Sequence, residues 1–130
     1  MKEHPSILVV DDDEMTRELI SHTLREEGFK VTAESDGLHA VVKSSELKPD
    51  LIILDMMLPD LSGLEVLSIL RIDLLMIVTP VIMISRLGQQ KLRHFANKLG
   101  VTDYLVKPFE MKQLLEKIYS IPGFGSCPAL

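Results

Sequence analysis

The sequence of 130 residues has one cysteine, no tryptophan and only 5% aromatic residues. A single cysteine, Cys127, excludes a disulfide within the chain and indicates a reducing compartment. Basic residues are also few, with 14 Lys and Arg against 19 Asp and Glu, which gives a formal net charge of −5. Because the chain has no basic block, we expect no direct contact between this segment and nucleic acid.

Long hydrophobic runs are missing as well. The longest apolar stretch, residues 74–84, is interrupted by Thr79 and Pro80 and is shorter than the roughly 20 residues that span a bilayer. The N-terminus has no apolar signal core. We therefore expect a soluble, cytoplasmic protein without a membrane partner, and the length predicts a single domain.

Short apolar runs alternate with amphipathic stretches along the chain. We expect strands at 7–10, 30–33, 51–54, 81–84 and 104–106, and helices at 14–26, 38–47, from a Ser62 cap through Leu70, 89–99 and 110–119. Strands separated by helices run parallel, because each crossover returns the chain to the same end. The pattern predicts an α/β fold of five βα units, (βα)5, in residues 1–120. The Pro- and Gly-rich residues 121–130 indicate a linker or C-terminal tail.

Polar side chains follow four of these strands at their carboxyl ends. Asp11 and Asp12 follow the first strand, Asp55 the third, Ser85 the fourth and Lys107 the fifth. In an open parallel sheet these ends lie together, and ligands bind there. An acid pair, a lone acid, a hydroxyl and a lysine are the groups that a magnesium-assisted phosphoryl transfer to a carboxylate requires.

Four segments of the chain resemble the receiver domains of two-component response regulators: ILVVDDD at 7–13, PDLIILDMMLPDLSG at 49–63, TPVIMIS at 79–85 and DYLVKPF at 103–109. The resemblance covers nearly the whole chain, from Ser6 to about Tyr119. It implies a flavodoxin-like, doubly wound parallel sheet with the strand order 2-1-3-4-5.

The same resemblance implies a phosphoacceptor switch rather than an enzyme acting on other molecules. A sensor histidine kinase or a phosphotransfer protein would supply the phosphoryl group. The switched surface around the fourth helix, fifth strand and fifth helix would signal to an output domain or downstream protein, and phosphorylation could also bring two copies together as a homodimer. Asp55 would accept the phosphoryl group, Lys107 would pair with it, and Ser85 and Tyr104 would form the switch. The Lys107–Pro108 peptide bond would be cis, as is common in the family.

A metal site is part of this expectation. The resemblance places Mg²⁺, or alternatively Mn²⁺, against the carboxylates of Asp12 and Asp55 and the backbone carbonyl of Met57, with Asp11 acting through a water. Three carboxylates in one pocket repel one another, and a divalent cation removes that repulsion. Asp13 is expected to lie at a solvated helix N-terminus.

The sequence departs from the family pattern at a few positions. Arg86 follows Ser85 where the family usually has a small residue, so it would either screen the site or pair with the phosphate. Met57 and Leu87 flank the path of the attacking water and have no group to orient it. Residues 71–79 are unusually apolar, which fits either a longer helix end packed on the sheet or an exposed patch for a partner or second copy.

One rival function is a haloacid-dehalogenase-like phosphatase, which also uses an aspartate nucleophile, a lysine and Mg²⁺. Asp11 and Asp13 match its Asp-x-Asp pattern, but the run after Lys107 offers only Glu110 and Glu116 where that family needs an acidic pair, and Asp55 stays unexplained. A degenerate receiver that serves only as an interaction module would have lost an acid or Lys107, and the chain retains them all.

Overall fold

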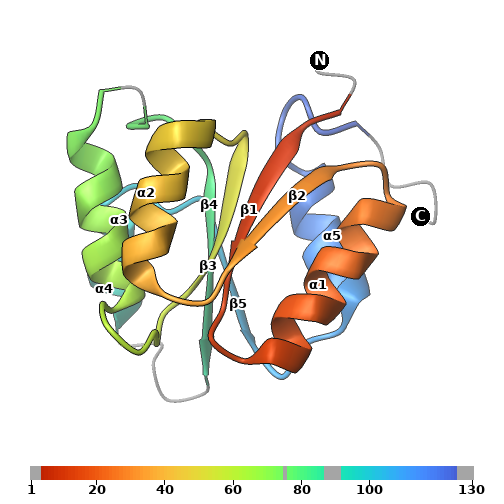
Figure 1. Ribbon diagram of the computed structural model, residues 1–130, viewed down its shortest axis with the longest axis horizontal. Helices are drawn as coiled ribbons and strands as arrows, with labels where there is room; N and C mark the ends of the chain where they lie inside the picture. The colour runs from red at the N-terminus through yellow and green to blue at the C-terminus, as the bar shows by residue number, and fades with distance from the viewer. Residues whose placement is uncertain (1–3, 75, 87–91, 126–130) are drawn as a thin grey trace.

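A computed structural model describes residues 4–74, 76–86 and 92–125 as an α/β sandwich (Figure 1). Five parallel strands form one sheet in the order β2-β1-β3-β4-β5, which confirms the predicted fold and strand order. The strands are β1 (Ser6–Val10), β2 (Lys30–Glu34), β3 (Leu51–Asp55), β4 (Val81–Arg86) and β5 (Asp103–Lys107). The helices are α1 (Glu14–Glu26), α2 (Gly37–Leu47), α3 (Gly63–Ile72), α4 (Arg93–Lys98) and α5 (Met111–Tyr119).

Helices cover both faces of the sheet. In Figure 1, α1 and α5 lie on one face and α2, α3 and α4 on the other. Successive side chains of a strand point to opposite faces, so Ile7 and Val9 of β1 join the core under α1 and α5, whereas Leu8 and Val10 join the core under the other three helices. Burial on both faces explains why the central strands are uninterrupted apolar runs.

Side chains cap the N-termini of α1 and α3, the helices that follow β1 and β3. At α1, the Asp13 carboxylate accepts a hydrogen bond from the N–H of Thr16, which confirms its expected place at a helix N-terminus. At α3, the predicted cap Ser62 accepts a hydrogen bond from the N–H of Glu65 (3.1 Å). A polar oxygen at this position satisfies an N–H group that has no partner inside the helix. The caps therefore fix where α1 and α3 begin, and the residues after β1 and β3 lie at one edge of the sheet.

Residues 121–124 pack on the core rather than leaving it as a linker. Ile121 and Phe124 are buried in the cluster under α1 and α5, and the Phe124 ring lies 6.0 Å from that of Phe29, centroid to centroid. The packed domain therefore extends at least four residues beyond the boundary at 120 that we expected from sequence. The predicted helix at 89–99 corresponds to α4 in the structure. Residues 89–91 of that prediction lie outside the described ranges.

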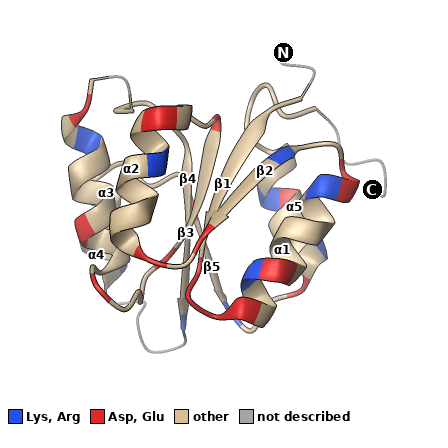
Figure 2. Ribbon diagram, in the orientation of Figure 1, with Lys and Arg blue, Asp and Glu red and all other residues tan. Residues whose placement is uncertain are grey.

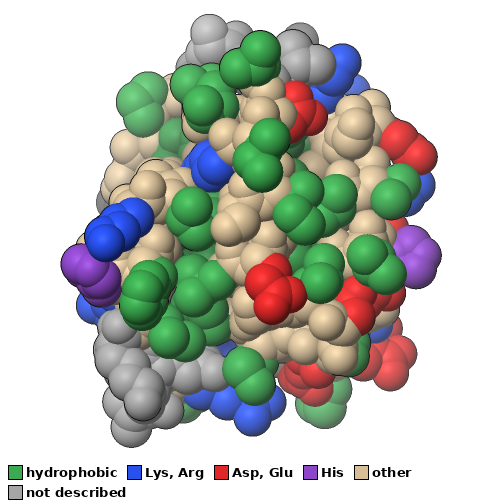
Figure 3. All heavy atoms as spheres, turned by 90° about the vertical axis from the view of Figure 1, so that its left-hand side faces the viewer, with side chains coloured by type: hydrophobic (Ala, Val, Ile, Leu, Met, Phe, Trp, Pro, Cys, Tyr) green, Lys and Arg blue, Asp and Glu red, His purple; other side chains and the backbone are tan. Residues whose placement is uncertain are grey.

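The apolar residues after α3 form an exposed patch rather than a longer packed helix. The helix ends at Ile72, and the side chains of Ile72, Leu74 and Val78 are 80%, 84% and 85% exposed, whereas Met76 is buried. Hydrophobic side chains are spread over this side of the molecule in Figure 3. None of the helices in the described ranges is long and apolar enough to cross a membrane.

Candidate functional site

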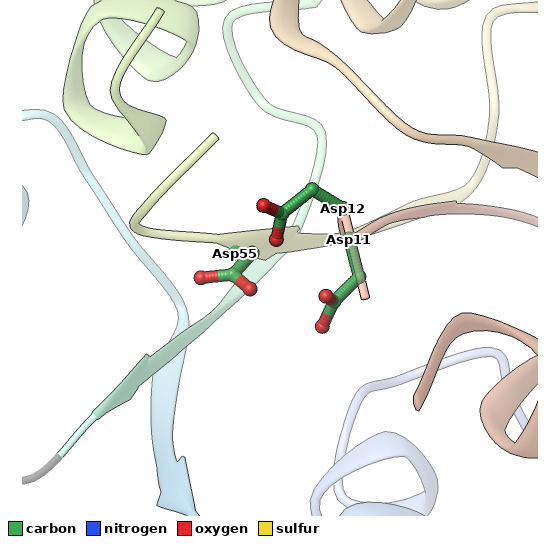
Figure 4. A group of neighbouring side chains, drawn as sticks. All are labelled: Asp11, Asp12 and Asp55. Carbon is green, nitrogen blue, oxygen red and sulfur yellow. The ribbon is translucent and has the colours of Figure 1, made fainter. Parts of the chain in front are cut away.

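Three carboxylates meet at the carboxyl ends of β1 and β3. Val10 and Leu54 are register partners, so the residues that follow them, Asp11 and Asp55, lie side by side. One carboxylate oxygen from each of Asp11, Asp12 and Asp55 lies within 4.8 Å of the others (Figure 4). Asp11 and Asp55 are buried and Asp12 is exposed. Figure 2 shows acidic residues gathered along this edge of the sheet. Such a group of oxygen ligands could hold a metal ion.

Lys107, at the end of β5, neutralises part of this charge. Its Nζ lies 2.8 Å from Asp55 Oδ2 and 2.9 Å from Asp11 Oδ2, and only 15% of its side chain is exposed. Burial acts to lower the pKa of Lys107, but the hydrogen bonds to Asp55 and Asp11 outweigh burial and raise it. Burial raises the pKa of Asp11 despite the hydrogen bond from Lys107. The Lys107–Pro108 peptide bond is cis, as the resemblance implied.

Backbone groups and one arginine hold the carboxylates in place. The N–H of Asp13 donates to Asp11 Oδ1 (2.9 Å), and the N–H of Met57 donates to Asp55 Oδ1 (2.9 Å). The guanidinium of Arg17 on α1 donates to the backbone carbonyl of Asp11 (2.8 Å). Our sequence reading missed Arg17, because a basic residue on an amphipathic helix is typical of a solvated face. The sequence feature that could have identified Arg17 is its position six residues after Asp11, in the first turn of the following helix.

Ser85 places a buried hydroxyl beside the acids. Asp55 and Ile84 are register partners, so Ser85 comes one residue later on the neighbouring strand. The side chain is 1% exposed, and its Oγ makes no hydrogen bond within the part of the chain that the structure describes. A buried hydroxyl without a partner costs free energy. Ser85 therefore offers a donor to a ligand that enters between β3 and β4.

Tyr104 of β5 is half-buried and its hydroxyl contacts α4. The hydroxyl oxygen lies 2.8 Å from the carbonyl oxygen of Arg93 and 2.5 Å from Asn97 Oδ1, so its proton is donated to that helix. The Arg93 guanidinium lies 4.7 Å from the centre of the Tyr104 ring. Burial raises the pKa of Tyr104. The ring therefore fastens α4 to β5 in this conformation.

Two of the residues at which the sequence departs from the family pattern, Met57 and Arg86, are exposed at the rim of the site. The Met57 side chain is 52% exposed. Arg86 is exposed at the end of β4, and its register partner is Lys107. Leu87 lies outside the described residues. A groove of about 540 Å³ begins at Arg86 and Lys107 and is lined further by Thr16, Leu19, Pro108, Phe109 and Met111.

Known proteins with this fold and sequence pattern are signalling proteins. The chain is 38% identical over 115 residues to the alkaline phosphatase synthesis transcriptional regulatory protein PhoP of Bacillus subtilis, which covers 88% of this chain and 47% of PhoP. It is 37% identical over 112 residues to the DNA-binding response regulator MtrA of Mycobacterium tuberculosis, which covers 86% of this chain and 48% of MtrA. The chain thus spans about half the length of the curated relatives it matches.

Solved structures and a family profile agree with these relatives. The chemotaxis protein CheY4 of Vibrio cholerae superposes with a TM-score of 0.86 at 30% identity, covering 91% of this chain and 98% of CheY4. The profile of the response regulator receiver domain matches residues 7–119. The phosphatase alternative finds no support in these matches. The chain therefore belongs to the receiver domain family of two-component response regulators.

Proposed function

We propose that Asp55 accepts a phosphoryl group from a phosphohistidine of a sensor histidine kinase or phosphotransfer protein, in a reaction that depends on Mg²⁺. The observation that carries this proposal is the position of Asp55: a buried carboxylate, 2.8 Å from Lys107 Nζ, beside two further carboxylates. A carboxylate is an adequate nucleophile when the donor is reactive, so the chain contributes mainly positioning and charge neutralisation.

In the proposed transfer, a carboxylate oxygen of Asp55 attacks the donor phosphorus and the phosphorus–nitrogen bond breaks, with its electrons going to the donor imidazole. Lys107 stabilises the negative charge on the phosphoryl oxygens. Asp12, Asp55 and the Met57 carbonyl would hold Mg²⁺ directly, with Asp11 acting through water, and Mn²⁺ offers the same chemistry. When bound, the ion neutralises the clustered carboxylates and the phosphoryl oxygens.

The proposed switch begins at Ser85, whose unpartnered hydroxyl would donate to a phosphoryl oxygen. Movement of the Ser85 loop toward Asp55 would leave space for Tyr104, which would then release its contacts with α4. The surface formed by α4, β5 and α5 would change as a result, because a local charge and a hydrogen bond bias an element with two arrangements.

The proposed partners follow from the class of the relatives. The names of MtrA and PhoP describe a DNA-binding and a transcriptional regulator. We propose that this domain signals to an output domain or downstream protein, with homodimerisation as one form of output. Nucleic-acid contact by this acidic segment itself is not part of the proposal, and the expected location is the cytoplasm. We propose that the phosphoryl donor approaches through the groove beside Arg86 and Lys107.

The test is labelling with acetyl phosphate and Mg²⁺, followed by intact-mass spectrometry. The wild-type protein should gain one phosphoryl group, and Asp55→Asn should gain none because its amide is not a nucleophile. Asp13→Asn is the matched control: it changes a neighbouring carboxylate at the α1 cap and should still be labelled. Undiminished labelling of Asp55→Asn would contradict the assignment.

A further inference from the structure

The loop between β3 and α3, residues 56–62, is tied to the start of α2 by the side chain of Asp60. Asp60 Oδ1 accepts hydrogen bonds from the N–H groups of Gly37 (2.7 Å) and Leu61 (2.8 Å). Its Oδ2 accepts one from the N–H of Leu38 (2.9 Å). A carboxylate from the loop that follows Asp55 therefore caps a helix more than 20 residues earlier in the chain.

The start of α2 depends on this carboxylate, because the first N–H groups of a helix have no partner inside it. Asp36, the residue that precedes α2, accepts a hydrogen bond from the N–H of His39 (2.8 Å). The N–H groups of Gly37 and Leu38 donate to Asp60 instead. The hydrogen bond from Gly37, followed by those from Leu38 and Leu61, lowers the pKa of Asp60 below its usual value. The carboxylate is therefore ionised at neutral pH, as the positive end of a helix favours.

Two glycines allow the loop to approach its neighbours so closely. A Cβ atom on Gly37 would lie 2.8 Å from Leu61 Cβ, and a Cβ on Gly63 would lie 2.5 Å from the backbone oxygen of Asp55. The N–H of Gly63 also donates to the carbonyl of Met56 (2.7 Å). The base of the loop therefore rests on the backbone of Asp55, while its tip is held by α2.

Met57 lies between these two attachment points, and its carbonyl is a ligand in the proposed metal site. We infer that Asp60 is a positioning residue, which clamps the loop to α2 and so orients the Met57 carbonyl for the metal. The inference rests on the proposed function and extends it to a residue that does not itself bind the metal. Groups that orient a metal ligand contribute to affinity because the ligand no longer has to be ordered when the ion binds.

Three variants separate positioning from charge and from helix capping. Asp60→Ala removes all three hydrogen bonds and the charge. Asp60→Asn removes the charge but keeps an amide oxygen that can accept from Gly37 and Leu61. Asp36→Ala removes the other cap of α2 and a nearby carboxylate, but leaves the loop tied. Mg²⁺ affinity is measured by titration of amide chemical shifts at constant ionic strength, with thermal unfolding alongside.

We expect Asp60→Ala to bind Mg²⁺ about tenfold more weakly than the wild type. Asp60→Asn and Asp36→Ala should stay close to the wild-type affinity, although Asp36→Ala should unfold at a lower temperature. In the metal-free protein, the amide signal of Met57 should shift in Asp60→Ala and stay in place in Asp36→Ala.

Several results would overturn the inference. Wild-type affinity in Asp60→Ala would show that the clamp does not orient the ligand. An equal loss in Asp60→Asn, which keeps an acceptor for Gly37 and Leu61 but not for Leu38, would show that the hydrogen bonds from Gly37 and Leu61 do not orient it. An equal loss of Mg²⁺ affinity in Asp36→Ala would show that the effect comes from helix capping alone. An unmoved Met57 signal in metal-free Asp60→Ala would exclude the clamp whatever the metal result. Absence of Mg²⁺ binding to the wild type is a separate failure, because it would contradict the proposed function itself.

Discussion

At the scale of single residues, the site holds more carboxylates than cationic groups. Asp11 and Asp55 are both buried and share one cation, Lys107, within 2.9 Å. Two buried carboxylates and one ammonium leave an excess of negative charge, and the exposed Asp12 adds to it. Buried charge is tolerated only when it is paired or bound to a cation. The excess of negative charge therefore favours binding of a metal cation beside these carboxylates.

We predict that two side chains, Met57 and Leu87, set the lifetime of the proposed acyl phosphate. Hydrolysis needs a water in line with the Asp55–phosphorus bond, and the apolar Met57 and Leu87 cannot hold one by hydrogen bonding. Replacing Met57 with Asn and Leu87 with Glu should shorten the lifetime by about tenfold, or about 1.4 kcal/mol of barrier. Phosphate release from the purified phosphoprotein measures this.

Met15→Asn is the control for that comparison, because Met15 is an exposed methionine on α1. Its release rate should equal that of the wild type. If the double variant releases phosphate no faster than the wild type, the two positions do not govern access of water.

At the scale of elements, α4 depends on contacts from its neighbours. Within the described residues it spans the six positions Arg93–Lys98, and an isolated helix of that length is not stable in water. The Tyr104 hydroxyl holds it from β5. The carbonyls of Leu99 and Gly100, beyond its C-terminal end, accept hydrogen bonds from Arg71 of α3. Loss of either contact should loosen α4 before the sheet is affected.

Tyr104→Phe should speed amide hydrogen exchange in Arg93–Lys98, because the helix loses the hydroxyl that fastens it to β5. The expected loss in the free energy of unfolding is about 1 kcal/mol. Tyr119→Phe is the matched control, since that hydroxyl donates to Glu27, the residue just after α1 (2.7 Å). If α4 exchanges at the same rate in both variants and the wild type, Tyr104 does not anchor it.

A contact at the start of α2 predicts that stability depends on pH. The hydrogen bond between His39 Nδ1 and Asp36 raises the pKa of His39 above its ordinary value of 6.5. A raised pKa in the folded state means that this contribution to stability is fully present below 6.5 and is lost as the pH rises through the raised value. NMR titration should show His39 titrating above 6.5, and Asp36→Asn should move it back toward that value. An unshifted His39 in the wild type would contradict the pairing.

At the scale of the whole molecule, the core reaches beyond α5. Ile121 and Phe124 extend the cluster that α1, α5 and β1 share, next to Phe29 and Tyr119. Residues 121–124 therefore close the end of the core opposite the carboxyl ends of the strands (Figure 1). Any segment that follows residue 125 would start from this packed anchor rather than from the end of α5.

Phe124→Ala should lower the free energy of unfolding by about 3 kcal/mol, as expected for removing a buried aromatic side chain. Pro122→Ala, at an exposed position of the same segment, should change it by less than about 0.5 kcal/mol. Urea unfolding of the two variants against the wild type provides the measurement. Equal stability of all three would place the tail outside the folded core.

Most of the architecture could be predicted from the sequence, because it depends on local periodicity. Runs buried on both faces identify the central strands, and helices between them require parallel pairing. The convergence of Asp11, Asp55, Ser85 and Lys107 follows from their common position at strand ends. The strand order came from resemblance, since periodicity alone does not say which strands are neighbours.

Contacts between distant segments were decided only by the tertiary structure. The pairing of Phe124 with Phe29 and the capping of α2 by Asp60 depend on where loops meet after the chain has folded. The exposure of Ile72, Leu74 and Val78 was equally undetermined, because an apolar run has the same pattern whether it packs on a sheet or faces water. Local pattern specifies the elements and the ends of the strands, whereas the geometry between elements determines which side chains then meet.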